Sequence, residues 1–258
     1  DTDNGQFGVS EVVEFQENAL VISLDDSFAE DIIAGRPHGL QAEVLRRDPI
    51  SGECGRVEAY DGPTDLRAWL TLQGDDPGAP APELDAGAGS AALPSLRPGS
   101  TNLTVNFTQG LAAMQLDATD VGHYALELED SESGLIVDEN GDPLTIAGTS
   151  LPLSVRPFGF AVSVSAPAKV NPAANSATGD AFQAAGRPFD IQVRAVQYDS
   201  ADDTDLDGQP DRHGDNDATN NADLTDNGTV DNFDASVVLS AYLSAGPTGA
   251  VDPGLAGL

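Results

Sequence analysis

Short apolar stretches, some alternating strictly with polar residues, recur along the chain and predict β-strands. Residues 125–129 read Ala-Leu-Glu-Leu-Glu, the alternation of a half-buried strand, and residues 20–24 form a short apolar run. Side chains two positions apart point to the same face of a strand, so such alternation buries one face of a sheet. Three further runs are predicted as strands: residues 102–107, 111–116 and 151–155. The pattern therefore predicts an all-β protein.

Turn signals between these runs indicate an immunoglobulin-like (Ig-like) sandwich. A Thr-Gln-Gly turn between residues 107 and 111 predicts a β-hairpin, as does Asn140-Gly141, and the Gly- and Pro-rich segment 74–99 predicts a loop. Asp120-Val-Gly-His-Tyr124 has the Asp-x-Gly-x-Tyr pattern of a tyrosine corner, in which the tyrosine hydroxyl bonds back to the backbone. About seven short strands in this order predict one Ig-like domain.

Part of the pattern occurs twice. Residues 34–48 (AGRPHGLQAEVLRRD) and 185–199 (AGRPFDIQVRAVQYD) share Ala-Gly-Arg-Pro, an apolar residue followed by Gln, and a final Asp, at an offset of 151. The apolar run 20–24 precedes the first copy, and a similar run, 160–164, precedes the second. A repeat of this length indicates two copies of one domain, because solenoid repeats are shorter.

The fold class is therefore predicted as tandem Ig-like β-sandwiches, with domains at residues 1–155 and 156–258. A third strand of each copy is predicted at residues 66–70 and 239–243. The second copy has no counterpart of the later strands of the first, so we expect it to be incomplete at its C-terminal end or completed elsewhere.

The second copy also carries an Asp-rich insertion, residues 199–234, between its second and third strands. Of these 36 residues twelve are Asp, five are Asn, and none is Glu or Lys. So many carboxylates within a Debye length of about 8 Å would repel one another in the absence of cations. Calcium ions, which take oxygen ligands, would remove this repulsion. The alternative is a solvated acidic linker.

Two stretches of the insertion have the spacing of calcium loops. In the first, the candidate ligands are Asp203, Asp205, Asp207, Gln209 through its carbonyl, and Asp211, with Asp215 and Asp217 closing the shell. Gly208 stands where the loop must turn, and the spacing is similar to that of thrombospondin type 3 repeats. In the second, which resembles a dockerin loop, they are Asp223, Asn227, Thr229, Asp231 and Asp234. A true dockerin would continue as a helix from residue 235 and dock onto a partner domain.

Composition narrows the classes of partner. The formal net charge is −32, of which residues 199–234 contribute −11. A field of this sign repels nucleic acid and anionic membranes, so we expect neither as a partner. No run approaches the roughly 18 apolar residues of a membrane span, and we expect no membrane insertion. The chain opens as a processed or excised segment would, and its single cysteine, Cys54, allows no internal disulfide.

Catalytic chemistry is not indicated. His38, His123 and His213 lie in no recognisable nucleophile or metalloprotease motif, and no phosphate-binding loop is present. The sequence therefore predicts a protein that is not an enzyme.

Several stretches together resemble the C-terminal region of MshQ-type proteins, of the mannose-sensitive haemagglutinin (MSHA) type IV pilus biogenesis group. They include DLRAWLTL, NLTVNFTQG, DVGHYALELED and VRPFGFAVSV. The resemblance implies an exported bacterial protein that lies at the cell surface or outside the cell, is associated with a pilus, and has a role in adhesion. Its partners would be other pilus or surface-filament subunits, or a host or surface receptor. The alternative function is a dockerin-like or carbohydrate-binding module that docks a partner through the calcium-loop region.

Overall fold

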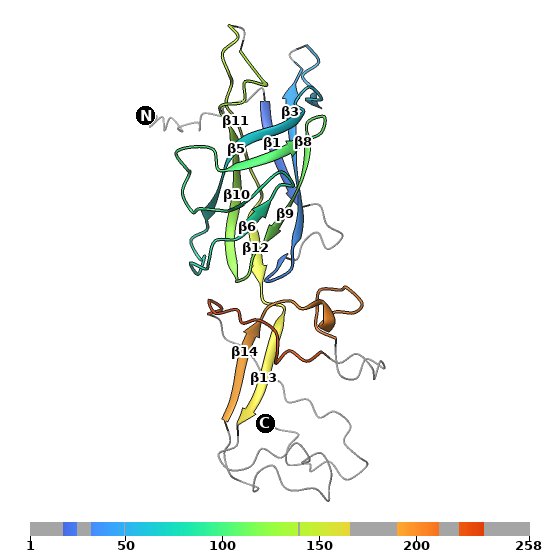
Figure 1. Ribbon diagram of the computed structural model, residues 1–258, viewed down its shortest axis with the longest axis vertical. Coiled ribbons are helices and arrows are strands. Elements are labelled where there is room, and N and C mark those ends of the chain that lie inside the picture. Colours follow the sequence, from blue (N-terminus) through green and yellow to red (C-terminus); the bar gives the residue numbers. More distant parts are fainter. Residues whose placement is uncertain are drawn as a thin grey trace, which may run out of the picture.

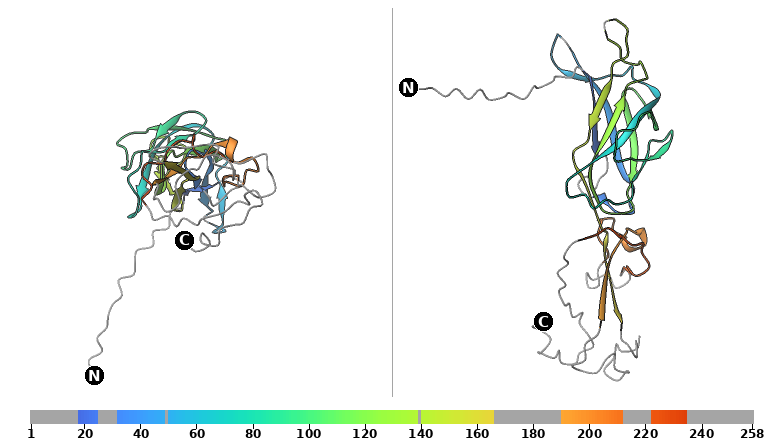
Figure 2. Two further views of the ribbon diagram at one scale, coloured as in Figure 1. Left: turned by 90° about the horizontal axis from the view of Figure 1, so that it is seen from below. Right: turned by 90° about the vertical axis from the view of Figure 1, so that its left-hand side faces the viewer.

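A computed structural model of the chain describes residues 18–24, 32–48, 50–138, 140–165, 190–211 and 222–234. Regular structure in these ranges consists of strands and one short 3-10 turn, η1 (Ser200–Asp202). The predicted all-β class is confirmed. Figure 1 and Figure 2 show a large sandwich joined end to end with a smaller unit built on two strands.

Two six-stranded sheets form the first unit. One has the strand order β1 (Asn18–Leu24), β3 (His38–Arg47), β9 (Leu111–Asp117), β6 (Glu83–Asp85) and β7 (Ser90–Ala92), with β4 (Cys54–Arg56) paired to β3. The other has the order β2 (Ile32–Ile33), β12 (Leu153–Arg156), β10 (Gly122–Asp130), β5 (Gly62–Leu72) and β8 (Leu103–Phe107), with β11 (Ile146–Thr149) paired to β10. The short strand β2 runs parallel to β12, and the other paired strands are antiparallel.

The hydrophobic core lies between these sheets. Alternate residues of β3 are buried along most of its length, as the period of a strand requires. Side chains from both sheets that are at most 4% exposed include Leu40, Val44, Leu66, Leu70, Met114, Leu116, Leu126 and Leu128. Burying a side chain of this kind contributes about 1.5–3 kcal/mol. Packing of these side chains between the two sheets therefore stabilises the first unit as a folded sandwich.

Two predictions about the first unit are wrong. The runs 102–107 and 111–116 do not pair as a hairpin: β8 joins β5 in one sheet and β9 joins β3 in the other. A tight turn at Gln109 and Gly110, both with positive φ, carries the chain across the core, so the two alternating runs face each other from opposite layers. The segment 74–99, predicted as a loop, contains β6 and β7.

The second unit repeats the pairing of the first. Strand β13 (Gly159–Ser165) pairs with β14 (Asp190–Val196) as β1 pairs with β3. Leu20 lies opposite Val44, and their counterparts in the repeat, Phe160 and Ala195, lie opposite each other. The same register in both copies supports the predicted duplication. The counterpart of β5, residues 239–243, lies outside the described residues, so that part of the repeat stays a prediction.

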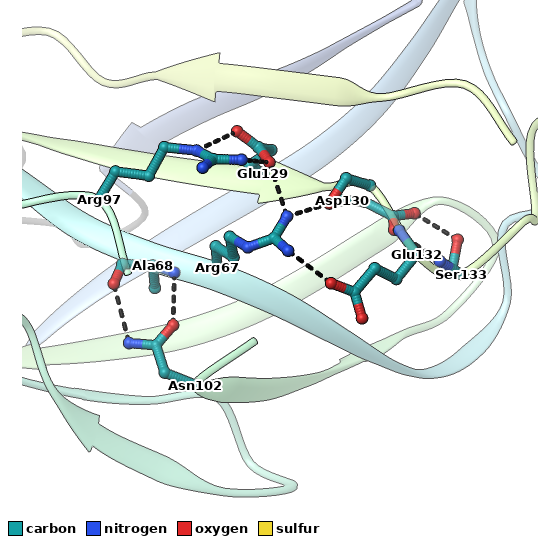
Figure 3. Close-up of polar contacts among 9 residues, drawn as sticks. Arg67, Ala68, Arg97, Asn102, Glu129, Asp130, Glu132 and Ser133 are labelled. Atoms are coloured by element: carbon teal, nitrogen blue, oxygen red, sulfur yellow. Dashed lines mark hydrogen bonds and ion pairs between the residues drawn. The ribbon is translucent and has the colours of Figure 1, made fainter. Parts of the chain in front are cut away.

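A buried ion cluster covers the outer face of β5 and β10. Arg67 on β5 donates to Glu129 on the neighbouring β10 over 2.9 Å, and each side chain is only about one tenth exposed. Arg97 reaches the same carboxylate from a loop, and Glu132 binds the other end of the Arg67 guanidinium, as Figure 3 shows. Beside this cluster, Asn102 exchanges two hydrogen bonds with the backbone of Ala68. These contacts tie the loop around residues 97–102 to the sheet.

Candidate metal centre

The Asp-rich stretch begins where β14 ends, beside the joint between the two units (Figure 1). Asp199 caps the 3-10 turn η1, because its Oδ1 accepts a hydrogen bond from the amide of Ala201 over 2.9 Å. The next residues, 203–208, curl back on themselves, with Leu206 at φ 60° and Gly208 at φ 79°. A positive φ suits glycine and strains leucine, so this turn is held by its surroundings.

Three carboxylates gather inside the turn. One oxygen from each of Asp203, Asp205 and Asp207 lies within 4.8 Å of the others. Asp203 is fully buried, and the other two are exposed. These are the first three ligands of the predicted calcium loop, and their proximity agrees with the spacing, while their binding of an ion stays a prediction.

Asp203 is the buried member of this group. Its Oδ2 accepts a hydrogen bond from the amide of Gly208 over 3.1 Å. Its Oδ1 is buried and has no hydrogen-bond partner among the described residues. A buried carboxylate oxygen without a partner costs free energy, and a cation beside it would recover that cost.

The electrostatics of the turn agree with this reading. Burial raises the pKa of the Asp203 carboxyl, the backbone amides of Gly208 and Asp207 oppose the shift, and the charges of Asp207 and Asp205 add to it. Negative charge is therefore concentrated at the three carboxylates, which offer only oxygen atoms as metal ligands and include the buried Oδ1 of Asp203. Such donors suit hard cations such as Ca²⁺.

Of the other predicted ligands of the first loop, the structure describes Asp211 and Gln209. The carboxylate of Asp211 accepts hydrogen bonds from the amide and hydroxyl of Thr204, the latter over 2.8 Å, and is not part of the three-carboxylate group. The backbone amide of Gln209 donates a hydrogen bond to Asp207 over 2.8 Å, and the role of the Gln209 carbonyl as a ligand stays a prediction. Asp215 and Asp217 lie outside the described residues, so their role stays a prediction.

The predicted ligands of the second loop form hydrogen bonds within the loop and with Gln197, the residue that follows β14, rather than converging on one position. Asp223 accepts hydrogen bonds from the amide and hydroxyl of Thr225, and these bonds lower the pKa of its carboxyl. Asn227 is buried and donates to the carbonyl of Gln197 over 3.1 Å. The carbonyl of Thr229 accepts from the side chain of the same Gln197.

The backbone at the end of this segment contacts the first unit. Asp231 donates its amide hydrogen to Asp120 over 3.2 Å. Within the described ranges, Asp223, Asp231 and Asp234 form no group of three carboxylates like that of the first loop. The structure thus brings together the first loop's leading ligands and does not assemble the acidic residues of the second loop in the same way.

Asp120 has a role that the sequence did not indicate. Its carboxylate accepts hydrogen bonds from the amides of Asp231 and Asn232 and, over 2.9 Å, from the side chain of Asn232. The predicted tyrosine corner is wrong, because the buried Tyr124 hydroxyl has no hydrogen-bond partner among the described residues. The first residue of the Asp-x-Gly-x-Tyr motif holds the second unit instead.

A cleft of about 670 Å³ opens beside this contact, between the two units. Its walls include the contact between His123 Nδ1 and Asp75 Oδ1, together with Arg156 and Phe233. Phe233 also packs edge-on against Phe160 of β13, with ring centroids 5.4 Å apart. Both units therefore contribute to the walls of this cleft.

No helix among the described residues is long and apolar enough to cross a membrane.

No curated protein matches the sequence. Among solved structures, a conjugative transposon lipoprotein from Bacteroides eggerthii is 11% identical, over 53% of this chain and 95% of that one, with a TM-score of 0.27. The CARDB domain of a Pyrococcus furiosus protein, solved in complex with di-metal ions, is 12% identical over 60% of this chain and 99% of that one, with a TM-score of 0.26. Both TM-scores are too low to carry meaning for this chain.

Two family models match it along most of its length. Residues 3–148 match the first Ig-like domain of a domain of unknown function, DUF6701, and residues 156–257 match the second domain of DUF6701. The first match alone covers more than half of the chain, and the protein therefore belongs to the DUF6701 family.

Proposed function

We propose that this protein is a non-enzymatic, calcium-stabilised tandem Ig-like module, which acts outside the cell as a structural or adhesive part of a surface filament. The observation that carries the calcium site is the buried carboxylate of Asp203, whose Oδ1 lacks a partner among the described residues while Asp205 and Asp207 lie close by. A buried carboxyl of this kind stays ionised where a positive charge compensates it, and a bound cation would supply that charge.

Calcium fits this donor set better than a transition metal does. The converging ligands are carboxylate oxygens, and neither sulfur nor imidazole belongs to the group. Ca²⁺ takes six to eight oxygens at about 2.3–2.6 Å in flexible geometry, and water completes the shell where the protein does not. Asp203, Asp205 and Asp207 would hold the ion, and the exposed side of the turn would admit the water.

A structural role agrees with what the histidines do. His38 is buried, and its Nε2 accepts a hydrogen bond from the amide of Ile33 over 2.9 Å. His123 is paired with Asp75. Both imidazoles support contacts between segments of the chain. We therefore propose that the protein catalyses no reaction.

The extracellular location and the association with a pilus are proposed from the resemblance to MshQ-type proteins. An elongated pair of sandwiches suits a spacer in a filament, and calcium at millimolar concentration outside the cell matches the affinity of extracellular calcium modules, about 10⁻⁴–10⁻³ M. The net charge of −32 favours partners that are not themselves acidic. Labelling of intact cells with an antibody against residues 50–138 would detect surface display, and labelling only after lysis would contradict it.

The calcium site is tested by Asp203→Asn, which replaces the charge with a neutral group of the same shape. At calcium one hundredfold above the dissociation constant, wild-type protein should gain about 2.7 kcal/mol in the free energy of unfolding. The variant should gain nothing. Without calcium it should be at least as stable as wild type, because an amide costs less to bury than a carboxylate.

Asp138→Asn is the matched control. Asp138 also accepts hydrogen bonds from amides of its own turn, those of Asn140 and Asp142, but the described residues place no carboxylate group like that of Asp203 around it. Chemical denaturation with and without calcium measures all three proteins. An equal calcium gain in the Asp203 variant would refute the site.

A further inference from the structure

We propose that cation binding at Asp203, Asp205 and Asp207 locks the joint between the two Ig-like units, so that the loop acts as a calcium-dependent brace. The inference rests on the proposed metal site and adds a consequence for how the units are held. Gly208 closes the turn behind the three carboxylates.

Gly208 connects the carboxylate group to the linker between the units. Its amide donates to Asp203 over 3.1 Å, and its carbonyl accepts a hydrogen bond from the guanidinium of Arg156 over 2.7 Å. Arg156 ends β12, the last strand of the first unit. One peptide segment therefore links the buried metal ligand to the inter-unit linker.

Arg156 also folds that linker around itself. Its Nη1 donates to the carbonyl of Pro157 over 2.9 Å and lies 3.4 Å from that of Phe158, the residue before β13. Its own carbonyl accepts from the amide of Ala34 in the first unit over 2.9 Å. The guanidinium thus joins the metal loop to Pro157 and Phe158, the two residues that connect β12 with β13.

The loop lies directly against the first unit as well. A Cβ placed on Gly208 would lie 3.0 Å from the side chain of Ile33 and 3.2 Å from that of Arg36, so the turn approaches β2 and the residues after it closely. Tyr198, five residues before Asp203, donates its amide hydrogen to the carbonyl of Ala34 over 2.8 Å. Its ring lies under the Arg36 guanidinium, 5.7 Å away.

A cation would act on these contacts by fixing the turn. Three converging carboxylates without a cation repel one another and favour an open turn, whereas coordination holds Gly208 in the conformation that faces Arg156 and Ile33. Because binding coupling is reciprocal, contacts that calcium strengthens at the joint must in turn strengthen calcium binding. A residue that touches no ligand atom then affects the affinity.

Arg156→Gln tests this coupling in the full chain. Removing a positive charge near the site should tighten cation binding by electrostatics alone, whereas loss of the brace should weaken it. We expect calcium affinity, measured by calorimetry, to fall by about fivefold or more, the lower end of typical coupling. Arg194→Gln is the matched control, because Arg194 donates to the carbonyl of Thr225 within the second unit. Its affinity should equal or exceed that of wild type.

A distance measurement tests the geometry independently. Cys54 is exposed on the first unit and takes one spin label, and Ser163→Cys, exposed on β13, takes the other. Calcium should narrow the distribution of distances between the labels in the otherwise wild-type protein and leave it broad when Arg156→Gln is added.

The outcomes separate the brace from the metal site. Absence of calcium binding to wild type overturns both proposals. Binding to wild type with an unchanged distance distribution, or with equal affinities in the Arg156 and Arg194 variants, overturns the brace alone and leaves the site intact. Weaker binding in the Arg156 variant together with narrowing in wild type supports the brace.

Discussion

Arg67→Met offers a strong test of how the first unit is held together. The substitution keeps most of the side-chain volume and removes the guanidinium that binds Glu129 and Glu132 (Figure 3). Breaking a buried ion pair by deleting one partner costs about 3–5 kcal/mol. Arg97 still contacts Glu129, so part of the charge stays compensated. We therefore expect a loss of about 3 kcal/mol, at the lower end of that range.

Arg56→Met is its control. Arg56 also pairs with a glutamate, Glu43, over 2.7 Å, but those side chains are 44% and 31% exposed. An exposed pair contributes about 0–1 kcal/mol. The two variants thus remove the same chemical interaction in two environments.

Urea denaturation followed by the fluorescence of Trp69 measures both variants. Trp69 is the single tryptophan and lies two residues from Arg67 on β5. The midpoint should fall strongly for the Arg67 variant, with an unchanged slope, and little for the Arg56 variant. Equal shifts below about 1 kcal/mol would show that the cluster behaves as a surface pair and would refute the reasoning.

Two further predictions concern pH and the joint. Hydrogen bonding to Arg97 holds the pKa of Glu129 below its usual value, so its contribution is complete above the unfolded-state pKa near 4.5 and is lost as pH falls through the lower folded-state pKa. Denaturation between pH 7 and pH 3 should therefore show a steeper loss of stability in wild type than in Glu129→Gln, and parallel curves would contradict this. Asp120→Ala removes the acceptor of the Asp231 and Asn232 bonds, and hydrogen bonds to charged groups contribute about 1.5–3 kcal/mol. Limited proteolysis should then cut the second unit sooner while the first stays resistant, and an unchanged pattern would contradict the role of Asp120.

The strand pattern could be predicted from sequence where strands are long and rich in apolar residues. β1 and β3 were found from their apolar runs and the AGRP repeat, and their register recurs in β13 and β14. β6 and β7 have three residues each in a stretch rich in Ala, Gly and Pro, so no period of two could be detected. Such short strands form because a neighbouring strand, β9 for β6 and β6 for β7, offers hydrogen bonds, which local sequence does not record.

The candidate site shows the same division between local and distant causes. The convergence of Asp203, Asp205 and Asp207 follows from alternate spacing around a glycine turn, and the sequence predicted it. Asp211 is not part of this group of three, and its carboxylate accepts hydrogen bonds from the amide and hydroxyl of Thr204 instead. The inter-unit role of Asp120 depends on residues more than 100 positions away. Spacing alone cannot reveal such contacts.

The most direct test of the account is a calorimetric titration of wild-type protein and Asp203→Asn with calcium, after removal of metal by chelation. We predict binding to wild type with a dissociation constant of about 10⁻⁴–10⁻³ M, as for other extracellular calcium modules. The variant should lose this binding while remaining folded. If wild type gives no heat of binding at millimolar calcium, or the variant binds equally well, the Asp-rich turn is only an acidic segment of the surface.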